Sequence, residues 1–162
     1  MKSNKGFTLI ELLAVIVILA IIALIATPII LDVIDTAKKG AKESSALGYI
    51  DAVEKQVMLA QVDTSAIKIP TGTYQVSVLS GNDLKVEVKG EEPANDGVVK
   101  IGTKGEVTQA WLTFDDYNVY YNGEKAVATK DAFATSGDDA KPTSGFCTVS
   151  GTTVSCGTTP GA

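Results

Sequence analysis

The stretch Gly6-Phe7-Thr8-Leu9-Ile10-Glu11 decides the interpretation of this chain. It follows a short polar segment, Met1–Lys5, that contains two lysines, and it precedes a run without charged residues, Leu12–Leu31. About 20 apolar residues are enough for a helix to span a bilayer. Glu11 stands out at the start of this helix, because a carboxylate inside an apolar membrane helix costs about 3 kcal/mol. We therefore expect Glu11 to have a function.

The same residues resemble the processing site of class III signal peptides, which occur in type IV pilins and in the pseudopilins of type II secretion. The resemblance implies that prepilin peptidase, a membrane-embedded aspartyl protease, cuts between Gly6 and Phe7 and then methylates the amino terminus of Phe7. It also implies that Glu11 acts in filament assembly and that the helix kinks or melts at Pro28. The short basic leader is similar to that of the type IVa branch. The resemblance covers about the first thirty residues.

Two simpler interpretations of the same residues are possible. A secretory signal peptide places its small-residue cleavage site after the apolar region, and alanines within Ala20–Ala26 mimic such a site. The apolar run continues past them, however. A plain transmembrane anchor fits the length but explains neither Glu11 nor the Gly6-Phe7 junction. The sequence favours processing before the helix.

Composition limits the function classes. The 162 residues carry a formal charge of −5, and loss of the leader with its two lysines leaves −7. An acidic surface repels phosphate, so no nucleic-acid binding is expected. The sequence has no histidine and no arginine, and therefore lacks the usual general base and the bidentate anion clamp. Gly102–Gly105 lacks the spacing of a phosphate loop, and the acidic pairs Asp115-Asp116 and Asp138-Asp139 lack that of an EF-hand. These acidic pairs could bind calcium, but solvated turns are the commoner explanation. We expect no enzyme, no cofactor and no metal.

The predicted fold class is α+β. One long helix from about Phe7 to Leu59 packs the apolar stripe of its second half on an antiparallel sheet. The basic leader stays cytoplasmic, which places the bulk of the chain outside. The predicted segments are a leader at 1–6, a transmembrane or filament-core helix at 7–31, and a globular head at 32–162. Within the head we predict an amphipathic helix at 32–60, a sheet at about 73–129, a loop at 130–145 and a terminal hairpin at 146–157.

Alternating apolar and polar residues locate the strands. The pattern predicts strands around Tyr74–Val78, Leu84–Val88, Val98–Ile101, Glu106–Phe114, Val119–Tyr121 and Glu124–Val127. Gly81-Asn82-Asp83 and Asn122-Gly123 are turn signals between them, the second being typical of a two-residue hairpin. Trp111, Leu112 and Phe114 are candidates for the core.

The last hairpin has its own register. A turn at Gly151-Thr152 sets Ser150 opposite Thr153 and Cys147 opposite Cys156. The two cysteines then form a non-hydrogen-bonded pair, with Cα atoms about 4.5 Å apart, within reach of a disulfide. The alternative is two free thiols. An exported chain favours the bridge, which resembles the disulfide-closed terminal loop of many type IV pilins.

Three functions follow from these observations. The first is a structural subunit of a type IV pilus, used in adhesion, twitching motility, aggregation or DNA uptake. The second is the major pseudopilin of a type II secretion or competence system, and the third is a singly anchored surface binding protein. The pilus interpretation implies a membrane-inserted precursor that later forms an extracellular surface filament. Its implied partners are further copies in a helical homopolymer, prepilin peptidase and the inner-membrane assembly platform.

Overall fold

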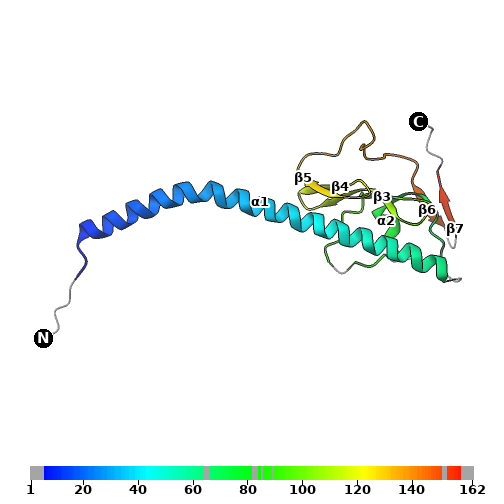
Figure 1. The fold of residues 1–162 in the computed structure, drawn as a ribbon, viewed down its shortest axis with the longest axis horizontal. Coiled ribbons are helices and arrows are strands. Elements are labelled where there is room, and N and C mark those ends of the chain that lie inside the picture. The colour runs from blue at the N-terminus through cyan, green and yellow to red at the C-terminus, as the bar shows by residue number, and fades with distance from the viewer. Residues whose placement is uncertain are drawn as a thin grey trace. The chain divides into compact units, whose positions relative to one another are not determined.

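The computed structural model describes residues 6–63, 66–81, 84, 86–88, 90–150 and 153–157 (Figure 1). The predicted leader falls largely on Met1–Lys5, which lies outside the described residues. The chain forms two compact units, Met1–Lys38 and Lys39–Ala162. We call the helical part of the first unit the stalk and the second unit the head; the predicted boundary at residue 32 stays a prediction.

The described elements follow one another in an α+β order. They are α1 (Leu9–Val62), β1 (Gly72–Gln75), α2 (Val76–Leu79), β2 (Val98–Ile101), β3 (Val107–Phe114), β4 (Tyr117–Tyr121), β5 (Ala126–Thr129), β6 (Cys147–Ser150) and β7 (Thr153–Cys156).

The stalk is a helix that exposes its apolar side chains. Large apolar residues from Leu9 to Ile34 are exposed, and Phe7 just before the helix is 91% exposed. Helix α1 is long and apolar enough to cross a membrane, with a mean hydropathy of 3.2 over its most apolar window. The predicted long amino-terminal helix is therefore confirmed.

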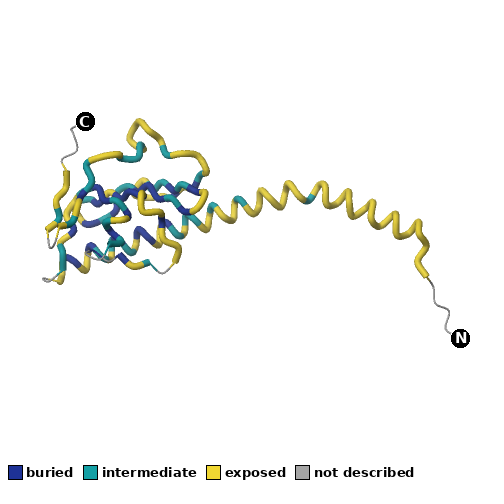
Figure 2. The backbone as a smooth tube through the Cα atoms, turned by 180° about the vertical axis from the view of Figure 1, so that it is seen from behind, coloured by how far each residue is buried: buried dark blue, intermediate teal, exposed yellow. Residues whose placement is uncertain are grey.

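In the head, the second half of α1 packs on a five-stranded antiparallel sheet with the order β1-β2-β3-β4-β5, as predicted. Figure 2 shows buried segments where helix and sheet meet and exposed segments on the outer side of the helix. The buried helix positions recur every three or four residues, as an amphipathic helix requires. They are Ala46, Tyr49, Ile50, Val53, Val57 and Ala60.

Charged side chains of α1 also bind the sheet. The Glu54 carboxylate accepts a hydrogen bond from the backbone amide of Val107 at 2.8 Å. The Glu43 carboxylate accepts one from the amide of Ala128 at 3.0 Å. Because β5 is an edge strand, the second bond satisfies an edge amide that would otherwise be open to pairing with another chain.

Of the predicted strands, Tyr74–Val78 is wrong in its second half, and Leu84–Val88 is wrong in its described residues. After β1 the chain enters the short helix α2, whose Val76 and Leu79 are buried. The Ser80 amide donates to the Val76 carbonyl at 2.9 Å and closes this single helical turn. The described residues within Leu84–Val88 form no strand, although Leu84 and Val86 are buried. The predicted turn residues Asn82 and Asp83 lie outside the described residues.

The remaining hairpins agree with the prediction, although β4 starts two residues earlier and β5 two residues later than predicted. Strands β2 and β3 flank the Gly102–Gly105 turn, and β4 and β5 flank Asn122-Gly123, where Gly123 has a φ of +92°. Strand β5 starts two residues later than predicted, because Asn122 uses its side-chain oxygen to accept from the amides of Glu124 and Lys125. These residues therefore belong to the turn.

Residues 130–146, which we call the strap, cover the sheet face opposite α1. Trp111 is 1% exposed, as expected of a core residue, but it lies under the strap because its neighbours Ala110 and Leu112 face the helix. Its indole donates to the carbonyl of Asp139 at 2.8 Å. The Tyr120 hydroxyl donates to the Asp139 carboxylate at 2.6 Å. The strap is thus hydrogen-bonded to the sheet.

The terminal hairpin has the predicted register, with Cys147 opposite Cys156 and Ser150 opposite Thr153. The predicted disulfide is confirmed, and its Cα atoms are 3.9 Å apart, closer than expected. The predicted turn residues Gly151 and Thr152 lie outside the described residues. The disulfide rests on β1 at Gly72, where an added Cβ would lie 2.3 Å from the Cys147 sulfur and 2.8 Å from the Cys156 sulfur. Only glycine fits there.

We therefore predict that Gly72→Ala destabilises the head. The new methyl group must displace the disulfide, and overpacking of this kind costs about 1–3 kcal/mol. Gly48→Ala is the matched control, because nothing lies within 4 Å of its added Cβ. At this helical position alanine is about 1 kcal/mol more favourable than glycine. Urea unfolding of the detergent-solubilised chain should shift in opposite directions for the two variants, and an equal or more stable Gly72→Ala would contradict the packing.

A second prediction concerns alkaline pH. Tyr49 is fully buried, and burial raises the pKa of its phenol to about 12, although nearby Ser80 offsets part of the effect. An unfolded tyrosine ionises near pH 10, so the unfolded chain loses this proton first and the free energy of unfolding falls between pH 10 and 12. Burial also raises the pKa of Tyr74 to about 12. Tyr49→Phe should weaken this decline without abolishing it, as measured by urea unfolding from pH 8 to 11.5; an unchanged slope contradicts the assignment.

Candidate functional site

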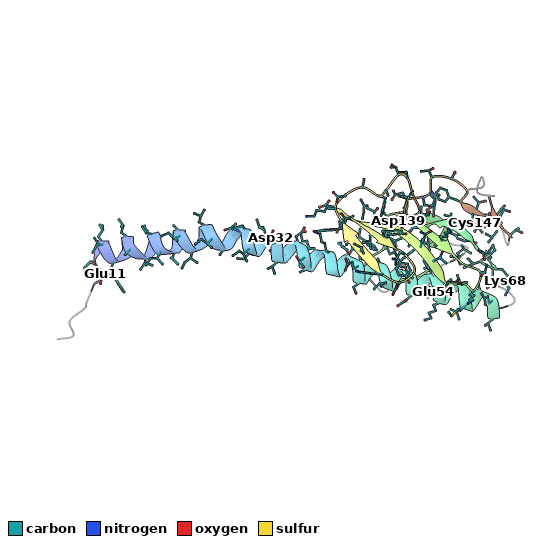
Figure 3. All side chains as sticks on the ribbon, turned by 45° about the horizontal axis from the view of Figure 1, so that its top comes forward. Glu11, Asp32, Glu54, Lys68, Asp139 and Cys147 are labelled. Carbon is teal, nitrogen blue, oxygen red and sulfur yellow. A yellow bond between two sulfur atoms is a disulfide. The ribbon has the colours of Figure 1, made fainter. Side chains whose placement is uncertain are left out.

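The candidate site is the start of helix α1 (Figure 3). The helix begins at Leu9, so Thr8 takes the N-cap position and Glu11 the third helical position. The Glu11 amide donates to the Thr8 hydroxyl oxygen at 3.3 Å. In return, Glu11 Oε2 accepts from the Thr8 amide at 2.8 Å and from the Thr8 hydroxyl at 2.6 Å. This reciprocal arrangement is a capping box.

The capping box gives Glu11 a role within its own chain. The carboxylate satisfies an amide that the helix itself cannot bond, and it lies at the positive end of the helix dipole. Both bonds from Thr8 fall on Oε2, so among the described residues Oε1 is left for another donor. This cap was not predicted from the sequence. The missed signal was the spacing Thr8-x-x-Glu11 before an apolar run, which is typical of a capping box.

The predicted cleavage site lies just before this box. Gly6, Phe7 and Thr8 are exposed and not helical. A Cβ added at Gly6 would have no other atom within 4 Å. Proteases act on exposed, non-helical segments, and this backbone meets that requirement. Cleavage at Gly6/Phe7 and methylation of Phe7 stay predictions.

The predicted kink residue, Pro28, lies inside α1, which the structure describes as continuous. Proline has no amide hydrogen and leaves the carbonyl four residues earlier without its helical donor. The Thr27 hydroxyl donates to the Ala23 carbonyl at 2.6 Å and so adds a side-chain bond to the adjacent turn. Melting of the helix at Pro28 remains a prediction.

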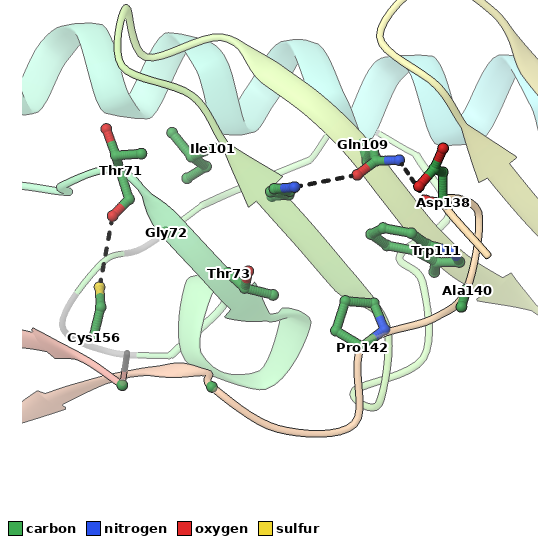
Figure 4. Close-up of a pocket in the computed structure, with 13 residues that line it drawn as sticks. Thr71, Gly72, Thr73, Ile101, Gln109, Trp111, Asp138, Ala140, Pro142 and Cys156 are labelled. Atoms are coloured by element: carbon green, nitrogen blue, oxygen red, sulfur yellow. Dashed lines mark hydrogen bonds between the residues drawn. The ribbon is translucent and has the colours of Figure 1, made fainter. Parts of the chain in front are cut away.

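A pocket of about 430 Å³ lies between the sheet, the strap and the terminal hairpin (Figure 4). Some of its polar groups are used within the fold. The side-chain nitrogen of Gln109 donates to the Asp138 carbonyl at 3.0 Å, and its side-chain oxygen accepts from the Lys100 ammonium at 3.4 Å. The Cys156 sulfur lies 3.8 Å from the Thr71 carbonyl, but a disulfide sulfur carries no hydrogen, so this is a contact only. The pocket presents no nucleophile with a base. In the described part of the chain no cluster of potential metal ligands occurs.

Comparison with known proteins supports the amino-terminal site. Residues 1–27 match the family model described as the prokaryotic N-terminal methylation motif. No curated protein and no solved structure matches the chain. The chain therefore carries the class III signal typical of type IV pilins and pseudopilins, which confirms the resemblance. Such proteins are structural and not enzymes, and the motif implies processing by prepilin peptidase.

We predict that mass spectrometry of the mature chain finds a methylated Phe7 at its amino terminus. Gly6→Val should leave the full-length precursor in the membrane, because a branched side chain replaces the small residue before the cut. Gly90→Val is the matched control, since Gly90 is exposed with open space around it, and this variant should be processed normally. An intact Met1 in the mature chain, or a cut within Ala20–Ala26, would refute the predicted site.

Proposed function

We propose that this chain is a structural subunit that polymerises through α1 into a type IV pilus. The observation that carries the proposal is the Thr8–Glu11 capping box, which lies between a methylation motif and an exposed apolar helix. The exposed apolar helix continues into a folded head, and the described residues contain no catalytic arrangement. Both features are those expected of a structural subunit.

Before assembly, the membrane covers the stalk. Its exposed Leu, Ile and Val side chains are unfavourable in water and favourable in lipid. The lysines of the leader hold that end on the cytoplasmic side, so the head is exported. Prepilin peptidase then removes the leader, and the mature subunit passes to the inner-membrane assembly platform.

In the filament, stalks pack on one another and replace lipid contacts with apolar contacts. Contacts between Leu and Ile side chains do not fix the position of one helix along another. The amino group of Phe7 of a neighbouring copy supplies the fixing contact by binding Glu11 Oε1, while Thr8 holds Oε2. Opposite charges attract strongly in a low dielectric, and this offsets part of their desolvation.

A pseudopilin of a type II secretion or competence system carries the same motif and is the second candidate. The disulfide-closed terminal hairpin, docked on Gly72, favours the pilus. The third candidate is a singly anchored surface binding protein. It is disfavoured because Glu11 would have no role in it beyond the cap. We propose that the filament is used in adhesion, twitching motility, aggregation or DNA uptake. Long filaments on expressing cells would distinguish a pilus from a short pseudopilus.

The decisive test separates capping from assembly at Glu11. Glutamine serves in a capping box as glutamate does, so Glu11→Gln keeps the helix start but removes the charge that binds an amine. We predict normal cleavage and membrane level for Glu11→Gln, with surface filaments reduced about tenfold or more, the effect of losing roughly 1.4 kcal/mol. Glu11→Val should show the same loss. Thr8→Val, which weakens the cap and keeps the charge, should retain more filaments.

Wild-type filament counts from Glu11→Gln and Glu11→Val would remove the proposed assembly contact. Equal losses from Thr8→Val and Glu11→Gln would assign Glu11 to the cap alone. Electron microscopy of surface filaments and immunoblots of membrane fractions supply both measurements.

A further inference from the structure

The pocket between the sheet, the strap and the terminal hairpin has the size of a small-molecule site. Its volume of about 430 Å³ falls within the range of about 300–1,000 Å³ that such sites occupy. Strands β1, β2 and β3 form one wall, and the strap and the terminal hairpin form the others (Figure 4). The residues that decide what could bind there are Thr73, Lys100, Trp111, Asp138 and Pro142.

The hydroxyl of Thr73 faces the pocket without a partner. Thr73 is 9% exposed and lines the pocket, yet its hydroxyl makes no hydrogen bond within the described part of the chain. Buried polar groups are nearly always hydrogen-bonded. A hydroxyl both donates and accepts, so this one can bind either kind of group on a ligand that enters the pocket.

Two charged side chains flank Gln109 in the same pocket. Lys100 lies opposite Thr73 in the register of β1 and β2, so both side chains are on one face of the sheet. The Lys100 ammonium has three donors and makes one long hydrogen bond, to Gln109 at 3.4 Å. Asp138 binds Gln109 through its backbone carbonyl, and its carboxylate accepts no hydrogen bond from the described residues. The pocket therefore offers both open donors and an open acceptor.

The charges of the lining cancel. Among the described residues that line the pocket, Lys100 and Asp138 are the charged ones. The adjoining segments outside the described residues, Gly151-Thr152 and Thr158–Ala162, contain no charged side chain. An ion of either sign would meet a like charge beside the opposite one, whereas a hydroxyl accepts from an ammonium and donates to a carboxylate. The lining thus favours an uncharged ligand with several hydroxyls.

Apolar surface lies beside these polar groups. Trp111, Ala140 and Pro142 line the same side of the pocket, as Figure 4 shows. A sugar ring presents apolar C–H groups on its faces and hydroxyls around its rim, so it matches both parts of this lining. Apolar walls with a few placed polar groups are the usual composition of a specific small-molecule site.

We propose that this pocket binds a neutral sugar unit, either free or at the end of a glycan. Thr73 and Lys100 donate to hydroxyls of the sugar, the Asp138 carboxylate accepts from another, and the ring packs on Trp111 and Pro142. The inference goes beyond the proposed function and does not depend on filament formation, because the site lies within the head of one chain.

The single tryptophan of the chain, Trp111, reports on the pocket by its fluorescence. The full chain, in a detergent without a sugar headgroup, would be titrated with glucose, galactose, mannose, N-acetylglucosamine and N-acetylgalactosamine, and with their methyl glycosides. We expect a saturable change for at least one of them, with a dissociation constant on the order of 1 mM for a ligand of this size. Binding of a methyl glycoside assigns the end of a glycan, and binding of free sugars alone assigns a free sugar. No saturable change with any of these compounds overturns the proposal.

Matched substitutions test whether the sugar binds in this pocket. Thr73→Val removes the hydroxyl and keeps the shape, and Thr135→Val makes the same change at an exposed strap residue outside the pocket lining. Lys100→Met has its control in Lys104→Met, at an exposed residue of the β2–β3 turn. We expect the dissociation constant to rise about fivefold for Thr73→Val and Lys100→Met, the effect of one lost hydrogen bond. Both controls should bind as the wild type does.

Unchanged affinity in both pocket variants would overturn the proposal. Lys100 is exposed, so Lys100→Met decides the matter if Thr73→Val fails to fold. A chain that stops at Gly157 tests the nearest rival occupant, because Gly157 lines the pocket and Thr158–Ala162 follow it. We expect this shortened chain to bind the sugar as the full chain does. Sugar binding by the shortened chain alone would make the tail the occupant and overturn the proposal.

Discussion

The contact between the second half of α1 and the sheet is the constraint on which the rest of the head depends. Its helix side is one stripe, in which Tyr49, Val53 and Val57 are at most 1% exposed. Burying a side chain the size of valine contributes about 1.5–3 kcal/mol, so this stripe is a main source of stability. The stalk half of α1 has no sheet to cover it, and its large apolar side chains are exposed. In the proposed function, lipid or other copies cover them.

Apolar contacts alone leave the rotation and position of the helix on the sheet loosely defined. Hydrogen bonds from charged side chains of α1 fix both. Glu43 and Glu54 lie three turns apart and each accept a strand amide. Lys42 binds Glu91 and Asp115, and these hydrogen bonds raise the pKa of its ammonium. Asp115 lies in the β3–β4 turn, so Lys42 joins α1 to that turn. Sliding the helix by one turn would break the contacts of Lys42, Glu43 and Glu54 with the rest of the head.

The sequence predicts those parts of the fold that have local signals. Asn122-Gly123 gives one hairpin, and the spacing of Cys147 and Cys156 gives the register of another. Val76 and Val78 were misassigned to a strand because residues that alternate over so short a segment also fit one helical turn, which the bond from the Ser80 amide to the Val76 carbonyl closes. The burial of Trp111 under the strap depends on a bond to a residue 28 positions away. No local pattern contains that information.

The start of α1 shows how a costly carboxylate is tolerated within a single chain. In a single chain, Thr8 already gives Glu11 two hydrogen bonds, both on Oε2, so the group is partly satisfied without a neighbour. In the proposed filament, the neighbouring amine adds a contact to Oε1 and need not displace the first partner. The capping box therefore holds the carboxylate in one rotamer in both states, which lowers the entropy lost when copies associate. On this view the cap and the assembly contact are two uses of one side chain, separated by which of its oxygens is engaged.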